Sequence, residues 1–392
     1  MKRNKLMAAV LLFVMAISAA LVGCGGQESS SGDTIKVGIN YELTGAAADY
    51  GSTAKDAILL AFEEINAAGG VLGKTLEPVV LDNKSDAAEA LSVATKLITQ
   101  EGVVAHLGPA TTGATLNAVP VVTEYKIPLI TNSATNPDVT VDPQSGQTRE
   151  YVFRTCFIDP PQAVVGAEFA YNDLGVRKVA IYYDNTNDYS KGLYQVFKET
   201  IKQLGGEVVA EEGYVEADQE FRPTLTKFKQ AGAELIYIPG YYDKVAKIIS
   251  QAREIGIDVP FLGADGWDSP VLAEVAGPEA LNNTFFTNHY SPQDPDEKVQ
   301  SFVKAYQEKY GSVPASFSAT AYDAAYLLAD AIKRAGSADP EAITKALAET
   351  KDFEGITGKF SFDEKHNPVK EISIIEMKNG EQTLKTKIAP SN

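Results

Sequence analysis

Three loops rich in glycine and hydroxyl residues offer the groups best suited to hold a small polar ligand. They are residues 108–113, 131–137 and 263–268, and each follows an apolar run typical of a β-strand. Open α/β sheets bind ligands at the carboxyl ends of their strands. In the first loop, Thr112 stands where a helix is expected to begin, so its hydroxyl and the nearby N–H groups suit a carboxylate. Taken alone, Thr112 is explained better as an N-cap.

Signals of catalysis or metal binding are sparse. The three histidines, His106, His289 and His366, are far apart and lack metal-ligand spacing, so we expect each to be structural or exposed. The chain has no Gly-x-Ser-x-Gly, no dinucleotide fingerprint after the first strand and no cluster of Cys and His. We therefore expect no catalytic residue, no metal and no cofactor.

One segment is close to a phosphate-binding P-loop. Residues 68–75 (AGGVLGKT) differ from that motif only in having Ala68 instead of glycine. A P-loop follows a strand and opens a helix, whereas this segment follows a helical pattern and precedes a strand. We therefore predict that its glycines end the helix and turn the chain.

The N-terminus has the composition of a secretory signal. Lys2, Arg3 and Lys5 precede an apolar, uncharged run at 6–20, which is short for a membrane span. The charges and the run together predict that residues 1–23 form a signal peptide. An uncleaved anchor is the alternative.

The signal ends in Leu-Val-Gly-Cys, which resembles the bacterial lipobox. The resemblance implies cleavage before Cys24 and a diacylglycerol on its thiol, with residues 24–33 as a polar tether. The alternative is a cysteine placed there by chance. Two or more acyl chains hold a protein stably on a membrane.

Charge and cysteine content narrow the class of protein. The net charge is −17, and loss of the three positive charges in residues 1–23 would make it −20. Such an acidic chain is not expected to bind nucleic acid or anionic lipid surfaces. Once Cys24 is lipidated, Cys156 is the remaining thiol, so the fold must rest on its core. A chain of this length is expected to divide that core between two domains.

Strand and helix patterns alternate in two series along the chain. The first runs from 35–39 to 128–130 and the second from 179–183 to 261–262. Strands separated by helices predict an α/β fold with parallel sheets and helices on both faces. Helices are expected at 50–68, 86–100, 112–125, 189–204, 221–231, 242–255, 295–310, 318–335 and 340–349. Strands at 360–362 and 371–377 close the chain.

Five short segments carry a family resemblance that extends over residues 35–377. They are INAAGGVLGK at 65–74, DNKSD at 82–86, ATNP at 134–137, GYY at 240–242 and QAREIG at 251–256. Together they resemble the periplasmic-binding-protein family of branched-chain amino-acid ABC transporters, the leucine/isoleucine/valine-binding type.

The resemblance implies a type I periplasmic-binding-protein fold, with two Rossmann-like lobes of α/β structure joined by three crossovers. The crossovers are expected near 156–159, 287–290 and 361–368. The first lobe would comprise 34–156 plus 291–362, and the second 157–286 plus 369–390.

The resemblance also implies a binding site in the cleft between the lobes. A ligand carboxylate would meet Thr112, Ser133 and Thr135, and the ligand ammonium would meet Asp265 and the region of Thr135. The side chain of the ligand would lie under three tyrosines, Tyr50, Tyr189 and Tyr241. Asp268 is expected to cap the helix that follows at 270–275.

Two departures from the family pattern concern side-chain specificity. Where this chain has Asp265, relatives that prefer leucine, isoleucine or valine commonly have Glu in a Gly-Pro-Glu-Gly turn. Where it has Tyr50, they often have Trp or Phe. A shorter acid and an added phenol suit a different or broader set of ligands.

The expected function is that of an extracytoplasmic substrate-binding lipoprotein of an ABC importer, monomeric and anchored through Cys24, which delivers an amino acid to a membrane permease. The ligand is expected to be branched-chain or otherwise aliphatic. Three alternatives stay open: a receptor for a short-chain amide, urea or aromatic acid; a ligand-sensing module for signalling; and an enzyme that encloses its substrate between lobes.

Overall fold

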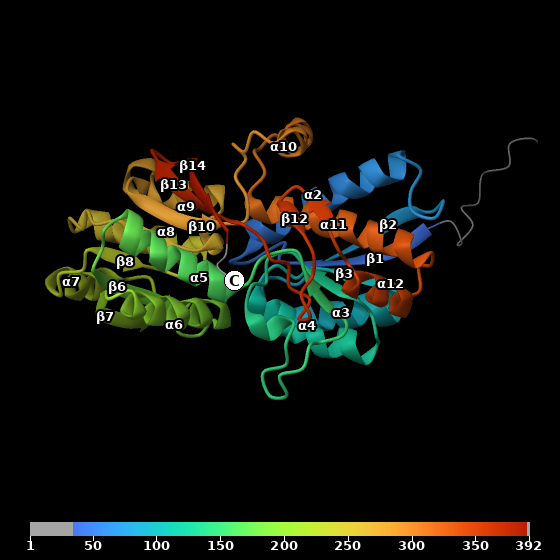
Figure 1. Cartoon of the computed structure of the whole chain (residues 1–392), viewed down its shortest axis with the longest axis horizontal. Helices are drawn as coiled ribbons and strands as arrows, with labels where there is room; N and C mark the ends of the chain where they lie inside the picture. The colour runs from blue at the N-terminus through green and yellow to red at the C-terminus, as the bar shows by residue number, and fades with distance from the viewer. Residues whose placement is uncertain (1–33, 390–392) are drawn as a thin grey trace, which may run out of the picture. The chain divides into compact units, whose positions relative to one another are not determined.

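The computed structural model describes residues 34–389, and Figure 1 shows their elements. The predicted signal peptide, Cys24 and the tether lie outside these residues. The described chain builds a five-stranded sheet in the order β2-β1-β3-β4-β5 and a seven-stranded sheet in the order β14-β13-β10-β9-β8-β6-β7. We call the first sheet with its helices the first lobe and the second sheet with its helices the second lobe. No helix within residues 34–389 is both long and apolar enough to cross a membrane.

In the first lobe, the pairs β1–β3, β3–β4 and β4–β5 are parallel. Helices α2 and α11 pack together, α11 also packs on α12, and α3 packs on α4. The strands are β1 (Thr34–Tyr41), β2 (Thr75–Asp82), β3 (Ala105–Leu107), β4 (Leu129–Thr131) and β5 (Val152–Arg154), with a separate hairpin of β11 (Phe353–Gly355) and β12 (Gly358–Phe360). The helices are α2 (Ala48–Ala67), α3 (Ala87–Lys96), α4 (Thr112–Glu124), α10 (Glu297–Tyr310), α11 (Ser316–Ala335) and α12 (Pro340–Ala348).

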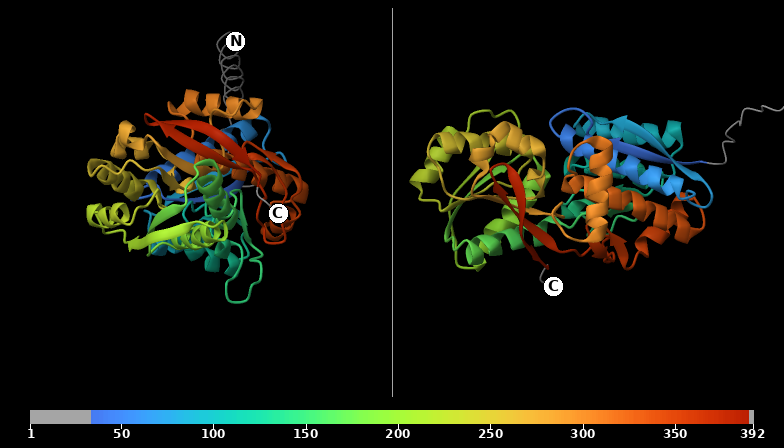
Figure 2. Two further views of the ribbon diagram at one scale, coloured as in Figure 1. Left: turned by 60° about the vertical axis from the view of Figure 1, so that its left-hand side comes forward. Right: turned by 90° about the horizontal axis from the view of Figure 1, so that it is seen from above.

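In the second lobe, β6 to β10 pair in parallel, and β13 and β14 add an antiparallel edge. Helices α5 and α6 pack together, as do α8 and α9 (Figure 2). The strands are β6 (Lys178–Asp184), β7 (Glu207–Tyr214), β8 (Leu235–Tyr237), β9 (Phe261–Gly263), β10 (Thr284–Asn288), β13 (Ile372–Lys378) and β14 (Glu381–Ile388). The helices are α5 (Asp159–Glu168), α6 (Asp188–Gln203), α7 (Arg222–Gln230), α8 (Tyr242–Glu254) and α9 (Pro270–Ala276).

The burial pattern explains why these segments form these elements. In β1, every residue from 37 to 41 is buried, as expected of a strand inside the sheet whose two faces are both covered. In α6, Leu193, Phe197 and Ile201 recur every four residues and are buried on one helix face.

The chain passes between the two lobes three times: between β5 and α5, between β10 and α10, and between β12 and β13. The predicted architecture, two lobes of α/β structure joined by three crossovers, is confirmed. The residue boundaries assigned to the lobes and crossovers stay a prediction.

The P-loop-like segment is a tight turn between α2 and β2. Gly69 and Gly70 adopt φ angles of 106° and 73°, which glycine tolerates without strain. Val71 and Lys74 then form an antiparallel bridge that leads into β2. The glycines therefore end the helix, as predicted.

Candidate functional site

A small cavity lies between the lobes where several predicted site residues meet. The first lobe contributes Tyr50, Ala110, Thr111, Ser133 and Phe317, and the second contributes Tyr189, Tyr241 and Asp265. Its volume is about 10 Å³, close to the least that holds one water molecule. An amino acid therefore enters this site only if the lobes move apart, as in hinge motions around ligands.

Five of the seven predicted ligand residues line this cavity; Thr112 and Thr135 are buried beside it but do not line it. The hydroxyl oxygens of Thr112 and Thr135 are buried and have no hydrogen-bond partner within residues 34–389. Unsatisfied buried hydroxyls are uncommon and call for a reason. Whether these seven residues bind a ligand stays a prediction.

Asp265 is the fully buried carboxylate of the cavity. Its Oδ1 accepts a hydrogen bond from the Tyr189 hydroxyl at 2.7 Å, and its Oδ2 lies 2.9 Å from His289 Nε2. Burial lowers the pKa of His289, so the neutral ring donates its Nε2–H to Asp265. The backbone N–H of Asp265 donates to Gln162 Oε1 at 2.9 Å. The carboxylate is thus held in one orientation by Tyr189 and His289, neither of which pairs it with a positive charge.

Local sequence places the aromatic wall of the second lobe. Asn187 caps α6 by accepting the N–H of Tyr189, which fixes that tyrosine in the first helical turn. The Tyr189 ring stacks on Tyr241 with ring centroids 5.2 Å apart. Gly266 brings its N–H to 3.0 Å from the Tyr189 hydroxyl, an approach that a larger residue would crowd. These tyrosines present flat apolar surface to the cavity.

Tyr50 joins the lobes directly. It lies on α2, is buried, and donates its hydroxyl to the backbone oxygen of Gly266 in the second lobe. The N–H of Tyr242 donates to the same hydroxyl at 3.3 Å. The Tyr50 ring also packs on Phe317, with centroids 4.8 Å apart. Sequence reasoning did not identify Phe317, because one apolar residue at the start of a helix has no distinguishing pattern.

The loop before α4 is organised by a buried acid that the sequence did not reveal. The carboxylate of Glu42 accepts the N–H groups of Ala110 and Thr111 and the Thr111 hydroxyl, at 3.1, 3.0 and 2.8 Å. Thr111, not Thr112, is the N-cap residue of α4 and lines the cavity. The first N–H groups of α4 have no partner inside the helix, which keeps the helix start suited to an anion.

Asp159 is a second buried carboxylate near Asp265. It begins α5, and neither of its oxygens has a hydrogen-bond partner within the described chain. Burial raises the pKa of Asp159 well above its ordinary value, the neighbouring Thr135 hydroxyl offsets part of this rise, and the charge of Asp265 raises the pKa further. Among acids in loops, nothing in the sequence distinguishes Asp159. A cation brought between Asp159 and Asp265 would satisfy both.

The three histidines divide by role. His106 and His366 are buried and bond to the backbone oxygens of Gly108 and Val152, so both fit the structural role expected of them. His289 instead reaches the site through Asp265. The described residues contain no group of three or more His, Cys, Asp or Glu arranged to hold a metal ion.

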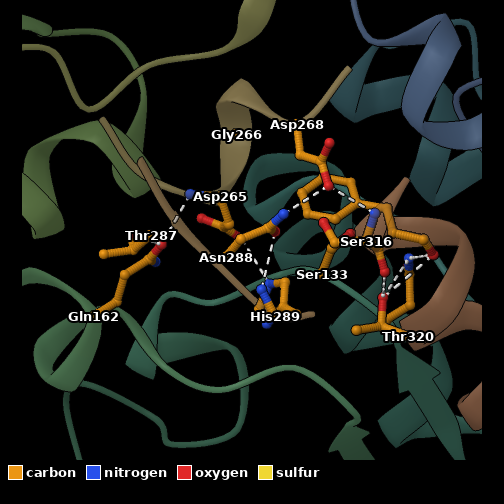
Figure 3. A network of polar contacts seen from close by, with 12 residues as sticks. Ser133, Gln162, Asp265, Gly266, Asp268, Thr287, Asn288, His289, Ser316 and Thr320 are labelled. Carbon is orange, nitrogen blue, oxygen red and sulfur yellow. Dashed lines mark hydrogen bonds and ion pairs between the residues drawn. The ribbon is translucent and has the colours of Figure 1, made fainter. Parts of the chain in front are cut away.

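The prediction that Asp268 caps the following helix is wrong. Ser269 caps α9 by accepting the N–H of Val271 at 3.1 Å. The carboxylate of Asp268 is turned to other donors, and Oδ2 accepts the N–H of Ser316 in the first lobe at 2.7 Å (Figure 3). Ser269 caps the helix instead of Asp268 because Ser269 occupies the N-cap position, from which its hydroxyl reaches the second N–H of α9.

A family model described as a periplasmic binding protein matches residues 34–382. This match covers the first sheet, the second sheet except most of β14, and the whole cavity. The chain belongs to the periplasmic binding protein family. Such proteins act outside the cytoplasm and bind solutes for transport. The match confirms the predicted family and, with it, the predicted fold.

Several members of the family are similar over most of their length. A leucine-, isoleucine-, valine-, threonine- and alanine-binding protein of Pseudomonas aeruginosa is 31% identical over 86% of this chain and 88% of its own. Among solved structures, the chain is similar to LivJ of Streptococcus pneumoniae, a branched-chain amino acid transporter substrate-binding protein in complex with isoleucine. The two are 41% identical with a TM-score of 0.85, and the match covers 91% of this chain and 99% of LivJ. The leucine-binding protein LivK of Thermotoga maritima is 36% identical with the same TM-score and the same coverage.

Proposed function

We propose that this periplasmic binding protein binds an amino acid with an aliphatic side chain, branched-chain residues foremost, and delivers it to the permease of an ABC importer. The observation that carries the proposal is the buried carboxyl group of Asp265 in a cavity walled by tyrosines from both lobes. A buried carboxylate paired only with neutral donors favours a cationic partner, and an α-ammonium supplies it. The relatives named above are receptors or homologues of receptors for such amino acids.

The two ends of an amino acid fit opposite parts of the site. The ammonium is assigned to Asp265, with Asp159 behind it. The carboxylate is assigned to the start of α4 at Thr112 and to the hydroxyls of Ser133 and Thr135, where helix N–H groups favour an anion. The rings of Tyr50, Tyr189 and Tyr241 are then left to cover the aliphatic side chain.

Binding should be measured by calorimetry and thermal shift with leucine, isoleucine and valine, and with two truncated relatives of leucine. One is 4-methylpentanoate, which lacks the ammonium, and the other is isoamylamine, which lacks the carboxylate. We expect leucine to bind and both truncated molecules to bind far more weakly. A ligand at 100 times its Kd should raise folding stability by about 2.7 kcal/mol. Equal binding of 4-methylpentanoate and leucine would reject the role of Asp265.

A screen of short-chain amides, urea and benzoate separates the amino-acid proposal from the alternative receptors. These molecules lack an ammonium group and leave the charge of Asp265 unpaired. We expect no stabilisation by any of them. Recovery of each ligand unchanged after prolonged incubation would argue against the enzyme alternative.

The mature protein is proposed to be a monomer held at the membrane by lipid on Cys24, with residues 24–33 as a tether. Support comes from the signal-like sequence at 1–23, which ends in Leu-Val-Gly-Cys. An anchored receptor stays near its permease, which raises the effective concentration of one for the other.

A further inference from the structure

The carboxylate of Asp268 makes a contact between the lobes that lies outside the ligand cavity. Asp268 follows Asp265 by three positions, directly after the short 3₁₀ helix Asp265–Trp267, and is only 1% exposed. Its Oδ2 accepts hydrogen bonds from the N–H of Ser316 at 2.7 Å and from Nδ2 of Asn288 at 2.8 Å (Figure 3). Its Oδ1 accepts one from Nε2 of Gln382 at 2.5 Å. Asn288 ends β10 and Gln382 lies in β14, so both belong to the sheet of the second lobe. The bond to Ser316 crosses to the first lobe.

Ser316 is the first residue of α11, a helix of 20 residues. The N-cap residue of α11 is Ala315, which has no side chain able to cap it. The start of a helix leaves N–H groups without partners and carries partial positive charge. By contrast, α3 and α12 are capped by Asp86 and Asp339 from directly before each helix. Asp268 therefore supplies to α11, from the other lobe, the acid that α11 lacks in its own sequence.

In each lobe, a residue close in sequence to the Asp268–Ser316 contact lines the ligand cavity. Phe317 follows Ser316 and lines the cavity from the first lobe, and Asp265 lines it from the second. Any movement that brings Asp265 and Phe317 together around a ligand also brings Asp268 onto Ser316. Hinge closure in two-lobed proteins joins such distant contacts in one step.

We propose that Asp268 is a closure residue, which stabilises the closed arrangement of the lobes by capping α11 across the cleft and so sets ligand affinity without touching the ligand. Asn288 and Gln382 hold the carboxylate in position from its own lobe, so little ordering is needed when Ser316 arrives. A contact made only in the closed form shifts the open–closed equilibrium, and affinity falls with the fraction of closed molecules. The proposal rests on the proposed function for its choice of leucine as probe.

The first test is Asp268→Asn, assayed with leucine by calorimetry and stopped-flow dissociation. This variant removes the negative charge at the start of α11. Its side-chain amide also replaces one acceptor oxygen with an NH2 group, which faces the amide donors of Asn288 and Gln382. Losing a hydrogen bond to a charged group corresponds to a rise in Kd of about 10-fold to 100-fold. We expect that rise mainly through faster dissociation. Small-angle X-ray scattering should show a larger radius of gyration than wild type at equal leucine.

A second variant, Ala315→Asp, separates closure from simple stability. It places an acid at the N-cap of α11, which should raise the melting temperature of the free protein. The same acid faces Asp268 when the lobes meet, so leucine should bind more weakly. If Asp268 only stabilised the fold, Ala315→Asp would not combine a higher melting temperature with weaker leucine binding.

Asp339→Ala is the matched control, because Asp339 caps α12 within the first lobe by accepting the N–H of Ala342 at 3.0 Å. It should lower the melting temperature and leave the Kd for leucine unchanged. Wild-type affinity and wild-type scattering in Asp268→Asn would overturn the closure role. Failure of the wild type to bind any amino acid would instead reject the proposed function. In that case the scattering of ligand-free Asp268→Asn and wild type would still decide the closure role, because equal radii would reject it.

Discussion

The Tyr189 hydroxyl donates a 2.7 Å hydrogen bond to Oδ1 of Asp265, and both side chains are almost completely buried. Burial raises the pKa of Tyr189 well above its ordinary value, so the phenol keeps its proton and remains a donor. Asp265 is therefore fixed in place by a neutral partner. This arrangement fixes the orientation of the carboxylate without pairing it with a positive charge.

Asp265→Asn should weaken leucine binding strongly. The variant keeps the size of the side chain but leaves the ligand ammonium buried without an anionic partner. Loss of one partner of a buried ion pair costs about 3–5 kcal/mol, or roughly 100-fold to 1,000-fold in Kd. Calorimetry on the variant and wild type measures the change, with Asp243→Asn as a control outside the cavity. Binding within a few-fold of wild type would remove Asp265 from the ammonium site.

Asp159→Asn should stabilise the ligand-free protein at neutral pH. Burial raises the pKa of Asp159 above the unfolded value of about 3.9, so the folded chain binds more protons between those two pKa values. Stability of the wild type therefore falls as pH rises through that range, and the variant escapes this loss. Its melting temperature should exceed that of wild type at pH 7, with the difference shrinking toward pH 4.

Asp173→Asn, an exposed acid on the same lobe, should follow the wild type at every pH. A lower melting temperature for Asp159→Asn at pH 7 would mean that the carboxylate is satisfied in the free protein, contrary to its lack of partners in the described chain.

Tyr50→Phe should weaken binding moderately without disturbing the fold. The change removes the hydroxyl that joins α2 to Gly266 and Tyr242 in the second lobe. Hydrogen bonds between neutral groups contribute about 0.5–1.5 kcal/mol, which predicts a Kd roughly 2-fold to 10-fold higher. Tyr306→Phe is the control, because that hydroxyl bonds to Thr53 within the first lobe. Equal effects of the two variants on leucine affinity would deny Tyr50 a special part in closure.

Cys24→Ala should release the protein from the membrane or arrest it as a precursor. The thiol at this position is the proposed site of lipid attachment, and without acyl chains the acidic chain has little affinity for a bilayer. Fractionation with immunoblotting, compared with Cys156→Ser, measures the outcome. Membrane-bound protein of mature size in Cys24→Ala would exclude the lipobox.

Local periodicity was sufficient to predict most strands and helices, because buried faces recur at fixed spacing in strands and helices. Residues 242–255, for example, were predicted as a helix, and α8 spans Tyr242–Glu254. Several elements escaped prediction, among them helix α5 and the strands β5, β10, β11 and β14. Helix α5 begins with two prolines in its first turn, a composition shared by loops. Strand β14 is rich in charged and polar residues, because it lies at the edge of the sheet and is largely accessible to solvent.

The sequence by itself determined the two-lobed α/β plan through local patterns and the family through contiguous motifs. The three tyrosines and the acid that line the cavity were implied by that family resemblance and not by any local pattern. Only the tertiary structure decided which polar residues face one another. Asp268 meets Ser316 across 48 positions of the chain, and Asp265 meets His289 across 24. A polar residue looks the same in sequence whether it is solvated or buried. Its partner is set by how the lobes pack, and that packing is distributed over the whole core.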